Sequence, residues 1–146
     1  MSMSNASETN LLNLLFNNVD WPNVGDAAGL QNSATAGSFY VALHSSDPGD
    51  AGNQTTNEVS YTGYARVGVA RSAGGFTVSG SQVSNAATVQ FGECTAGTAT
   101  ATHFSVGLLS AGAGDILYSG ALSASRNISS GITPLFNSGA LQGVID

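Results

Sequence analysis

The chain has 146 residues and a mass of 14.6 kDa, which is the size of one domain with its own hydrophobic core. Nine acidic residues and three arginines give a formal net charge of −6, and only 8% of the residues are charged. This balance argues against a nucleic-acid binder, which needs cations to neutralise phosphates, and against a protein that docks on an anionic membrane.

The cysteine count and the apolar segments indicate the compartment in which the protein folds. Cys94 is the one cysteine, so no disulfide forms within the chain. The apolar stretch of residues 11–16 is far too short to span a bilayer, and no secretory signal pattern precedes it. We therefore expect a protein that is made and folded in the cytoplasm.

One helix is predicted, over residues 6–18. Asn5 followed by Glu8 suggests a capping box at its start, and Pro22 disfavours helix at the preceding residue. We expect residues 1–22 to form an N-terminal arm and helix, and residues 23–146 to form one β domain.

From residue 38 onward the hydrophobic period changes from 3.6 to 2, which is the period of strands. In the strand expected over residues 64–70, Ala65, Val67 and Val69 face inward and Arg66 faces outward. About eight short strands separated by turns predict a mainly β fold, an antiparallel β-sandwich or jelly-roll-like single domain with one N-terminal α-helix. The predicted strands are residues 38–44, 64–70, 76–78, a short strand at 83, 89–91, 100–109, 116–122, 127–132 and 140–145.

The sequence offers no catalytic, metal-binding or cofactor-binding motif. Cys94 has no partner histidine nearby, and no Gly-x-Ser-x-Gly motif stands between a strand and a helix. His44 and His103 lie on different predicted strands with no metal-ligand spacing. Residues 47–53 carry oxygen ligands but lack the EF-hand register, so turn caps explain them better than calcium. We expect no enzyme, no metal and no cofactor.

Three residues are candidates for a partner interface: Trp21, Arg66 and Arg71. In a chain with three cations, each arginine is expected to have a fixed partner, either on another subunit or in an ordinary intrachain salt bridge. Trp21, the one tryptophan, either anchors an interface or packs the helix against the sheet.

Three motifs in order resemble a family of small tailed-phage virion proteins. Residues 39–52 read FYVALHSSDPGDAG, residues 58–67 read EVSYTGYARV, and residues 99–107 read ATATHFSVG, followed by ILYSGAL at 116–122. The resemblance covers most of the chain from about residue 8 and implies a virion structural component. It brings no catalytic residues, and the absence of lysine here departs from the family.

These observations lead us to expect a capsid decoration, or cement, protein. It would sit on the outer capsid surface of the virion as a dimer or trimer and stabilise contacts between subunits of the phage major capsid protein, with no nucleic-acid or membrane partner. Two alternatives stay open. One is a tail or tail-fibre component; the other is a small glycan-binding module that uses exposed tyrosines, for which Tyr40, Tyr61, Tyr64 and Tyr118 are available.

Overall fold

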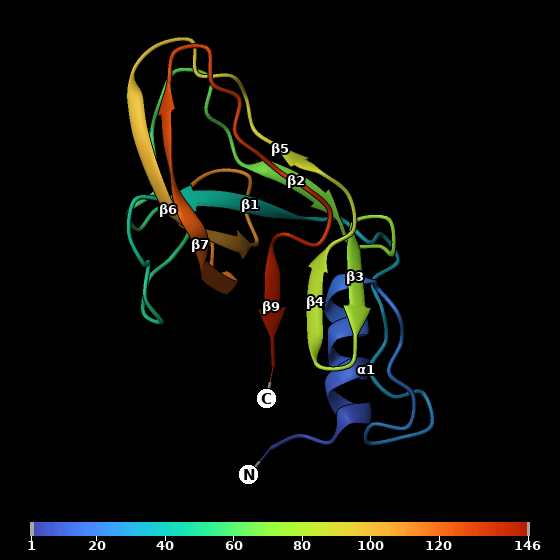
Figure 1. Cartoon of the computed structure of the whole chain (residues 1–146). Helices are drawn as coiled ribbons and strands as arrows, with labels where there is room; N and C mark the ends of the chain where they lie inside the picture. The colour runs from blue at the N-terminus through green and yellow to red at the C-terminus, as the bar shows by residue number, and fades with distance from the viewer. Residues whose placement is uncertain (1, 146) are drawn as a thin grey trace. The chain divides into compact units, whose positions relative to one another are not determined.

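The computed structural model describes residues 2–145, which divide into two compact units. The helical unit combines the residues up to 38 with residues 70–87 and those from 138 onward. The large-sheet unit consists of residues 39–69 and 88–137. The expected class is confirmed, because the described chain is mainly β, with antiparallel sheets and the single helix α1 (Figure 1).

The helix α1 spans Asn5–Phe16, close to the predicted range. Its N-cap is Ser4, whose side chain accepts a hydrogen bond from the backbone N–H of Ser7 at 3.3 Å. The expected capping box at Asn5 is therefore wrong by one residue, since Ser4 already has the extended backbone and the hydroxyl that a cap requires. The helix ends before Asn18, which has a positive φ of 56°.

In the helical unit, α1 packs against a three-stranded sheet of order β3-β4-β9. Leu12 and Phe16 are buried on the helix, and the Phe16 ring meets Phe76 edge-to-face with centroids 5.0 Å apart. Asn85 ties the sheet together, because its side-chain oxygen accepts from the backbone N–H of Leu141 at 2.9 Å. The strands are β3 (Phe76–Ser79), β4 (Gln82–Asn85) and β9 (Gln142–Val144).

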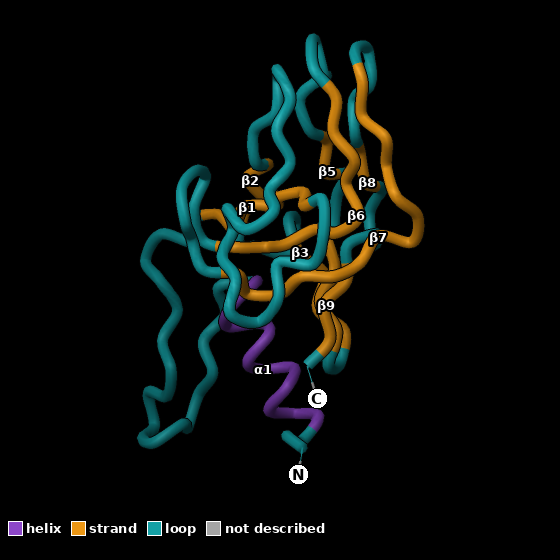
Figure 2. Tube along the Cα trace, turned by 90° about the vertical axis from the view of Figure 1, so that its left-hand side faces the viewer, coloured by secondary structure: helices purple, strands orange, loops and turns teal. Residues whose placement is uncertain are grey.

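The large-sheet unit is built on a four-stranded sheet of order β2-β1-β6-β7, accompanied by the short pair β5-β8. Figures 1 and 2 show β6 and β7 as long neighbouring strands. The central pair is antiparallel, with Val41 opposite Val106 and Leu43 opposite Phe104, so all four side chains are buried. The strands are β1 (Ser38–His44), β2 (Val67–Ala70), β5 (Val89–Gln90), β6 (Thr98–Gly107), β7 (Ile116–Ser129) and β8 (Leu135–Phe136).

Three strand predictions need correction. The two strands expected at 116–122 and 127–132 are one strand, β7, which contains a register shift against β6 between Ala101 and His103. The strand β8, which was not predicted, is only two residues long and follows Pro134. Residues 64–66 precede β2 rather than belonging to it, so the expected alternation fails there and Arg66 is buried instead of facing outward.

No helix among residues 2–145 has the length and apolar character needed to cross a membrane.

Candidate functional site

The second motif folds into a buried polar cluster around the carboxylate of Glu58. The guanidinium of Arg66 donates to it twice, from Nε to Oε1 and from Nη2 to Oε2, both at 2.7 Å. The hydroxyl of Tyr64 donates to Oε1 at 2.8 Å. Arg66 and Glu58 therefore form a bidentate ion pair. The pair is largely shielded from water, because the Arg66 side chain is only 3% exposed and that of Glu58 is 17% exposed.

This cluster is joined to the first motif and to the turn that follows the third. The Tyr64 hydroxyl accepts from the backbone N–H of Leu43 in β1 at 3.1 Å, and Arg66 Nη1 donates to the carbonyl of Leu109 at 3.0 Å. Burial raises the pKa of Tyr64, and the hydrogen bonds that Arg66 donates to Glu58 raise the pKa of Arg66, so the phenol stays neutral and the guanidinium stays charged. The cluster therefore fixes the segment after residue 57 against β1 and against the turn after β6.

A second buried contact joins the first motif to the third. His44 Nδ1 lies 2.7 Å from the carbonyl oxygen of Thr56, which only accepts, so Nδ1 carries the hydrogen of the neutral ring. Nε2 then accepts from the hydroxyl of Ser105 at 2.8 Å. This is the arrangement of a nucleophile and its general base, but both residues have 0% exposed surface. Since no substrate reaches the Ser105 oxygen, the pair acts as a strut between β1 and β6.

Because His44 is buried, we expect the protein to lose stability in mild acid. Burial lowers the pKa of His44 from its ordinary 6.5. Below pH 6.5 His44 binds a proton in the unfolded chain but not in the folded chain. The free energy of unfolding therefore falls as the pH decreases below 6.5, and it recovers when the pH is raised above 6.5. Between about pH 7 and about pH 5 the free energy of unfolding should fall by at most about 2 kcal/mol. Urea unfolding at the two pH values measures this fall.

The matched variants are His44→Gln and His103→Gln. The first should remove this pH-dependent component even if it lowers stability overall. The second replaces a half-exposed histidine on β6 and should retain it. A wild-type stability that is flat across this interval would contradict the argument.

Gln54 fastens the long loop between β1 and β2 to the turn that follows β6. Its side-chain nitrogen donates to the carbonyl of Tyr40 at 3.2 Å, and its side-chain oxygen accepts from the backbone N–H of Leu109 at 2.9 Å. Its own backbone N–H donates to the carbonyl of Gly114 at 2.8 Å. Gln54 is 0% exposed, so a residue in a loop that reads as polar from the sequence is part of the interior.

The three interface candidates lie in different surroundings. Trp21 is half-buried in the helical unit, and its backbone exchanges two 2.9 Å hydrogen bonds with Leu30. Arg71 belongs to the same unit and donates to the carbonyls of Leu14 and Leu15, in the last turn of α1, and to that of Ala36. A cation at this position stabilises the helix C-terminus.

Arg66 belongs to the large-sheet unit and is held by Glu58. Both candidate arginines therefore have partners within their own unit. An interface role for Trp21, Arg66 and Arg71 stays a prediction.

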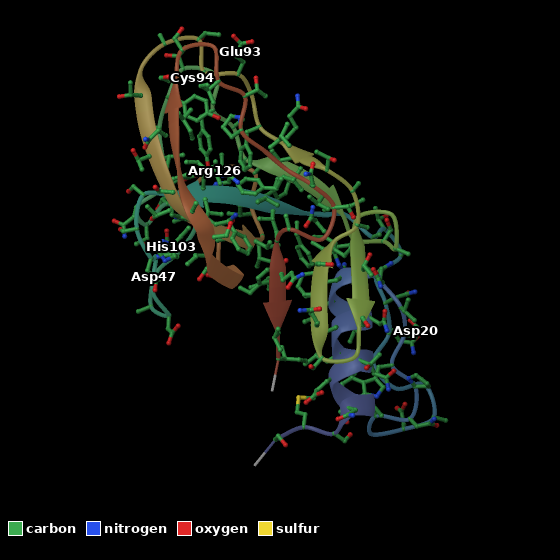
Figure 3. The ribbon with its side chains drawn as sticks, in the orientation of Figure 1. Asp20, Asp47, Glu93, Cys94, His103 and Arg126 are labelled. Carbon is green, nitrogen blue, oxygen red and sulfur yellow. The ribbon has the colours of Figure 1, made fainter. Side chains whose placement is uncertain are left out.

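Nucleophilic and metal-ligating side chains are dispersed. Figure 3 shows Glu93 and Cys94 away from Asp47 and His103 within the large-sheet unit. Across residues 2–145 no group of three or more His, Cys, Asp or Glu side chains is placed to hold a metal ion. Cys94 is buried and its Sγ lies 3.5 Å from the carbonyls of Ala96 and Gly97.

A mainly β chain that uses its motif residues for internal polar contacts has the character of a structural protein. A family model described as podophage GP4 fiber I protein gp80 matches residues 2–143, so the chain belongs to this family. No curated protein matches the sequence. The family confirms the expected class, a structural protein of the phage virion. Its description names a fibre, whereas the sequence led us to expect a capsid decoration protein.

Proposed function

We propose that this protein is a structural subunit of the virion's fibre apparatus. The observation that carries the proposal is the family match, which extends over residues 2–143 and whose description names a podophage fibre protein. On this proposal the partners of the chain are other fibre or tail components, and the virion location is the tail rather than the capsid surface.

The geometry supports a structural role without catalysis. The histidine–serine pair of His44 and Ser105 is sealed from solvent, and the ion pair of Glu58 and Arg66 is directed at the chain's own backbone and side chains. His44 and Ser105 join the first motif to the third, and the hydrogen bond from Leu43 to the Tyr64 hydroxyl joins the first motif to the second. A subunit whose buried motif residues are paired in this way is suited to holding a fixed shape, because each of these groups loses its partner if the strands separate.

The test is to locate the protein in the virion. Purified particles are separated into tails and heads, and the chain is quantified in each fraction by mass spectrometry, with the major capsid protein and a tail-tube protein as markers. We expect the chain to follow the tail marker, and antibody-labelled electron micrographs to show label at the fibres. Recovery with the heads, and label distributed over the capsid, would overturn the proposal in favour of a decoration protein bound to the major capsid protein.

A further inference from the structure

The strand β7 is a long open edge of the four-stranded sheet. In the described part of the chain its one sheet neighbour is β6, and Figure 2 shows it on the outer side of that pair. Proteins commonly protect such edges with lysine, proline or inward-pointing charges. The sequence of β7, ILYSGALSASRNIS, contains neither lysine nor proline and has Arg126 as its one charge. The register shift against β6 falls at residues 122–125, so the stretches of β7 on either side of it are those whose outer backbone groups are available to pair with another strand.

The C-terminal end of β7 is cationic and flanked by a hollow. A cavity of about 510 Å³ is lined by residues 125–128 of β7 and by residues 132–137. Ile132 and Leu135, which line it, are 45% and 47% exposed. Arg126 is exposed, and within residues 2–145 its side chain has no hydrogen bond or ion pair. This end therefore offers a free cation beside apolar surface.

The N-terminal end of β7 has the opposite charge. A smaller cavity of about 310 Å³ is lined by residues 116–119 of β7 together with Asp50 and its neighbouring glycines. Asp50 and Asp115 are both exposed there. Leu117, which also lines this cavity, is 37% exposed. The same strand therefore carries an acidic, partly apolar patch at one end and a cationic, partly apolar patch at the other.

We propose that β7 is a self-association edge, along which a second copy of this chain adds its own β7 antiparallel to the first. Within residues 2–145 Arg126 forms no ion pair, so the acidic residues at the other end of the strand do not neutralise it. Antiparallel pairing about a two-fold axis near Ala121 places Arg126 of one copy beside Asp50 of the partner subunit. It also places Leu117 against Ile132 and Leu135 of the other copy.

The two-fold arrangement explains why both patches lie on one strand. A two-fold interface is self-complementary, so every contact between the ends occurs twice. The inference concerns the isolated chain and holds or fails independently of where the protein lies in the virion. Other occupants of the edge, such as an acidic glycan or a segment of a different protein, would leave the purified chain monomeric.

Charge reversal tests the pairing directly. Sedimentation velocity and native mass spectrometry should show a concentration-dependent dimer of the full chain. Arg126→Glu and Asp50→Arg should each weaken this dimer by about tenfold or more, because each variant places like charges opposite one another twice. An equimolar mixture of the two variants should form a heterodimer, since both contacts then join opposite charges. The control is Glu93→Arg, which makes the same charge change as Asp50→Arg at an exposed position outside both cavities.

Circular dichroism spectra and melting curves of each variant establish that it is folded before its assembly is scored. The proposal is overturned if the wild-type chain stays monomeric throughout the micromolar range or forms a trimer. It is equally overturned if Arg126→Glu dimerises as tightly as the wild type, or if the two charge-reversed chains do not associate when mixed.

Discussion

Replacing Arg66 with leucine should lower the free energy of unfolding by about 3–5 kcal/mol, the range expected when one partner of a buried ion pair is removed. The loss arises because the carboxylate of Glu58 loses its cationic partner and two hydrogen bonds of 2.7 Å. The carbonyl of Leu109 loses its donor at the same time. Urea unfolding followed by far-ultraviolet circular dichroism measures the change.

The double variant Glu58→Leu, Arg66→Leu distinguishes two causes of this loss, an unpaired buried charge and a general packing defect. Removing both charges should recover much of the loss, since well-packed apolar residues often replace a buried ion pair at little cost. The surface control is Glu93→Gln, which removes an exposed charge and should change stability by no more than about 0.5 kcal/mol. A single-variant loss below about 1 kcal/mol would place Arg66 in the class of exposed ion pairs.

The elements with strong local patterns were predictable from the sequence. Strand β1 was predicted at its observed bounds, and β6 within two residues, because large apolar residues alternate along both segments of the sequence. Helix α1 was predicted within two residues for the corresponding reason at helical period. Where the chain is rich in serine and glycine the pattern weakens, and β7 was divided in two at residues 123–126 although its backbone continues.

The buried polar network could not be predicted in the same way. The sequence identifies Arg66 as one of three cations, but its environment depends on Glu58 and on the turn after β6, which only the tertiary fold brings together. Extending the strand period back to residue 64 placed Arg66 on the outer face, because alternation carries no information about an ion pair. The alternative of an ordinary intrachain salt bridge describes what the structure shows.

The same limit applies to His44 and Gln54. Each reads in the sequence as a polar residue in or beside a loop, and each has 0% exposed surface in the structure. Their hydrogen-bond partners are mostly backbone groups. Because every residue has a backbone, the residue types in the sequence could not have identified these partners. The motifs that carried the resemblance to phage virion proteins contain His44, Glu58 and Ser105, and the structure assigns all three to the interior framework.

Substituting Gly107 with alanine should destabilise the chain by overpacking this framework. A Cβ built at Gly107 would overlap Cδ of Gln54 and would lie 2.6 Å from the carbonyl oxygen of Asp115. The Gln54 side chain has no room to yield, because it is buried and hydrogen-bonded to Tyr40 and Leu109. On the side of Gly114 its oxygen leaves no space even for an added Cβ. Overpacking of this kind costs about 1–3 kcal/mol. Displacing the amide would add about 1–3 kcal/mol for each buried partner left unpaired.

A double-mutant cycle with Gln54→Ala identifies the cause of that loss. Gln54→Ala alone should destabilise the chain by depriving Leu109 and Tyr40 of their partners, but in the Gly107→Ala background it also makes room for the added methyl group. The double variant should therefore lose less free energy of unfolding than the sum of the two single variants. The difference, the coupling energy, should be about 1 kcal/mol or more. The matched control is Gly74→Ala, where the nearest atom to an added Cβ is 3.7 Å away and no positive φ is required, so its effect should stay within about 0.5 kcal/mol. If the two losses in stability are strictly additive, the methyl group strains the backbone at Asp115 rather than the Gln54 amide. The close packing assigned to the Gln54 side chain would then be wrong.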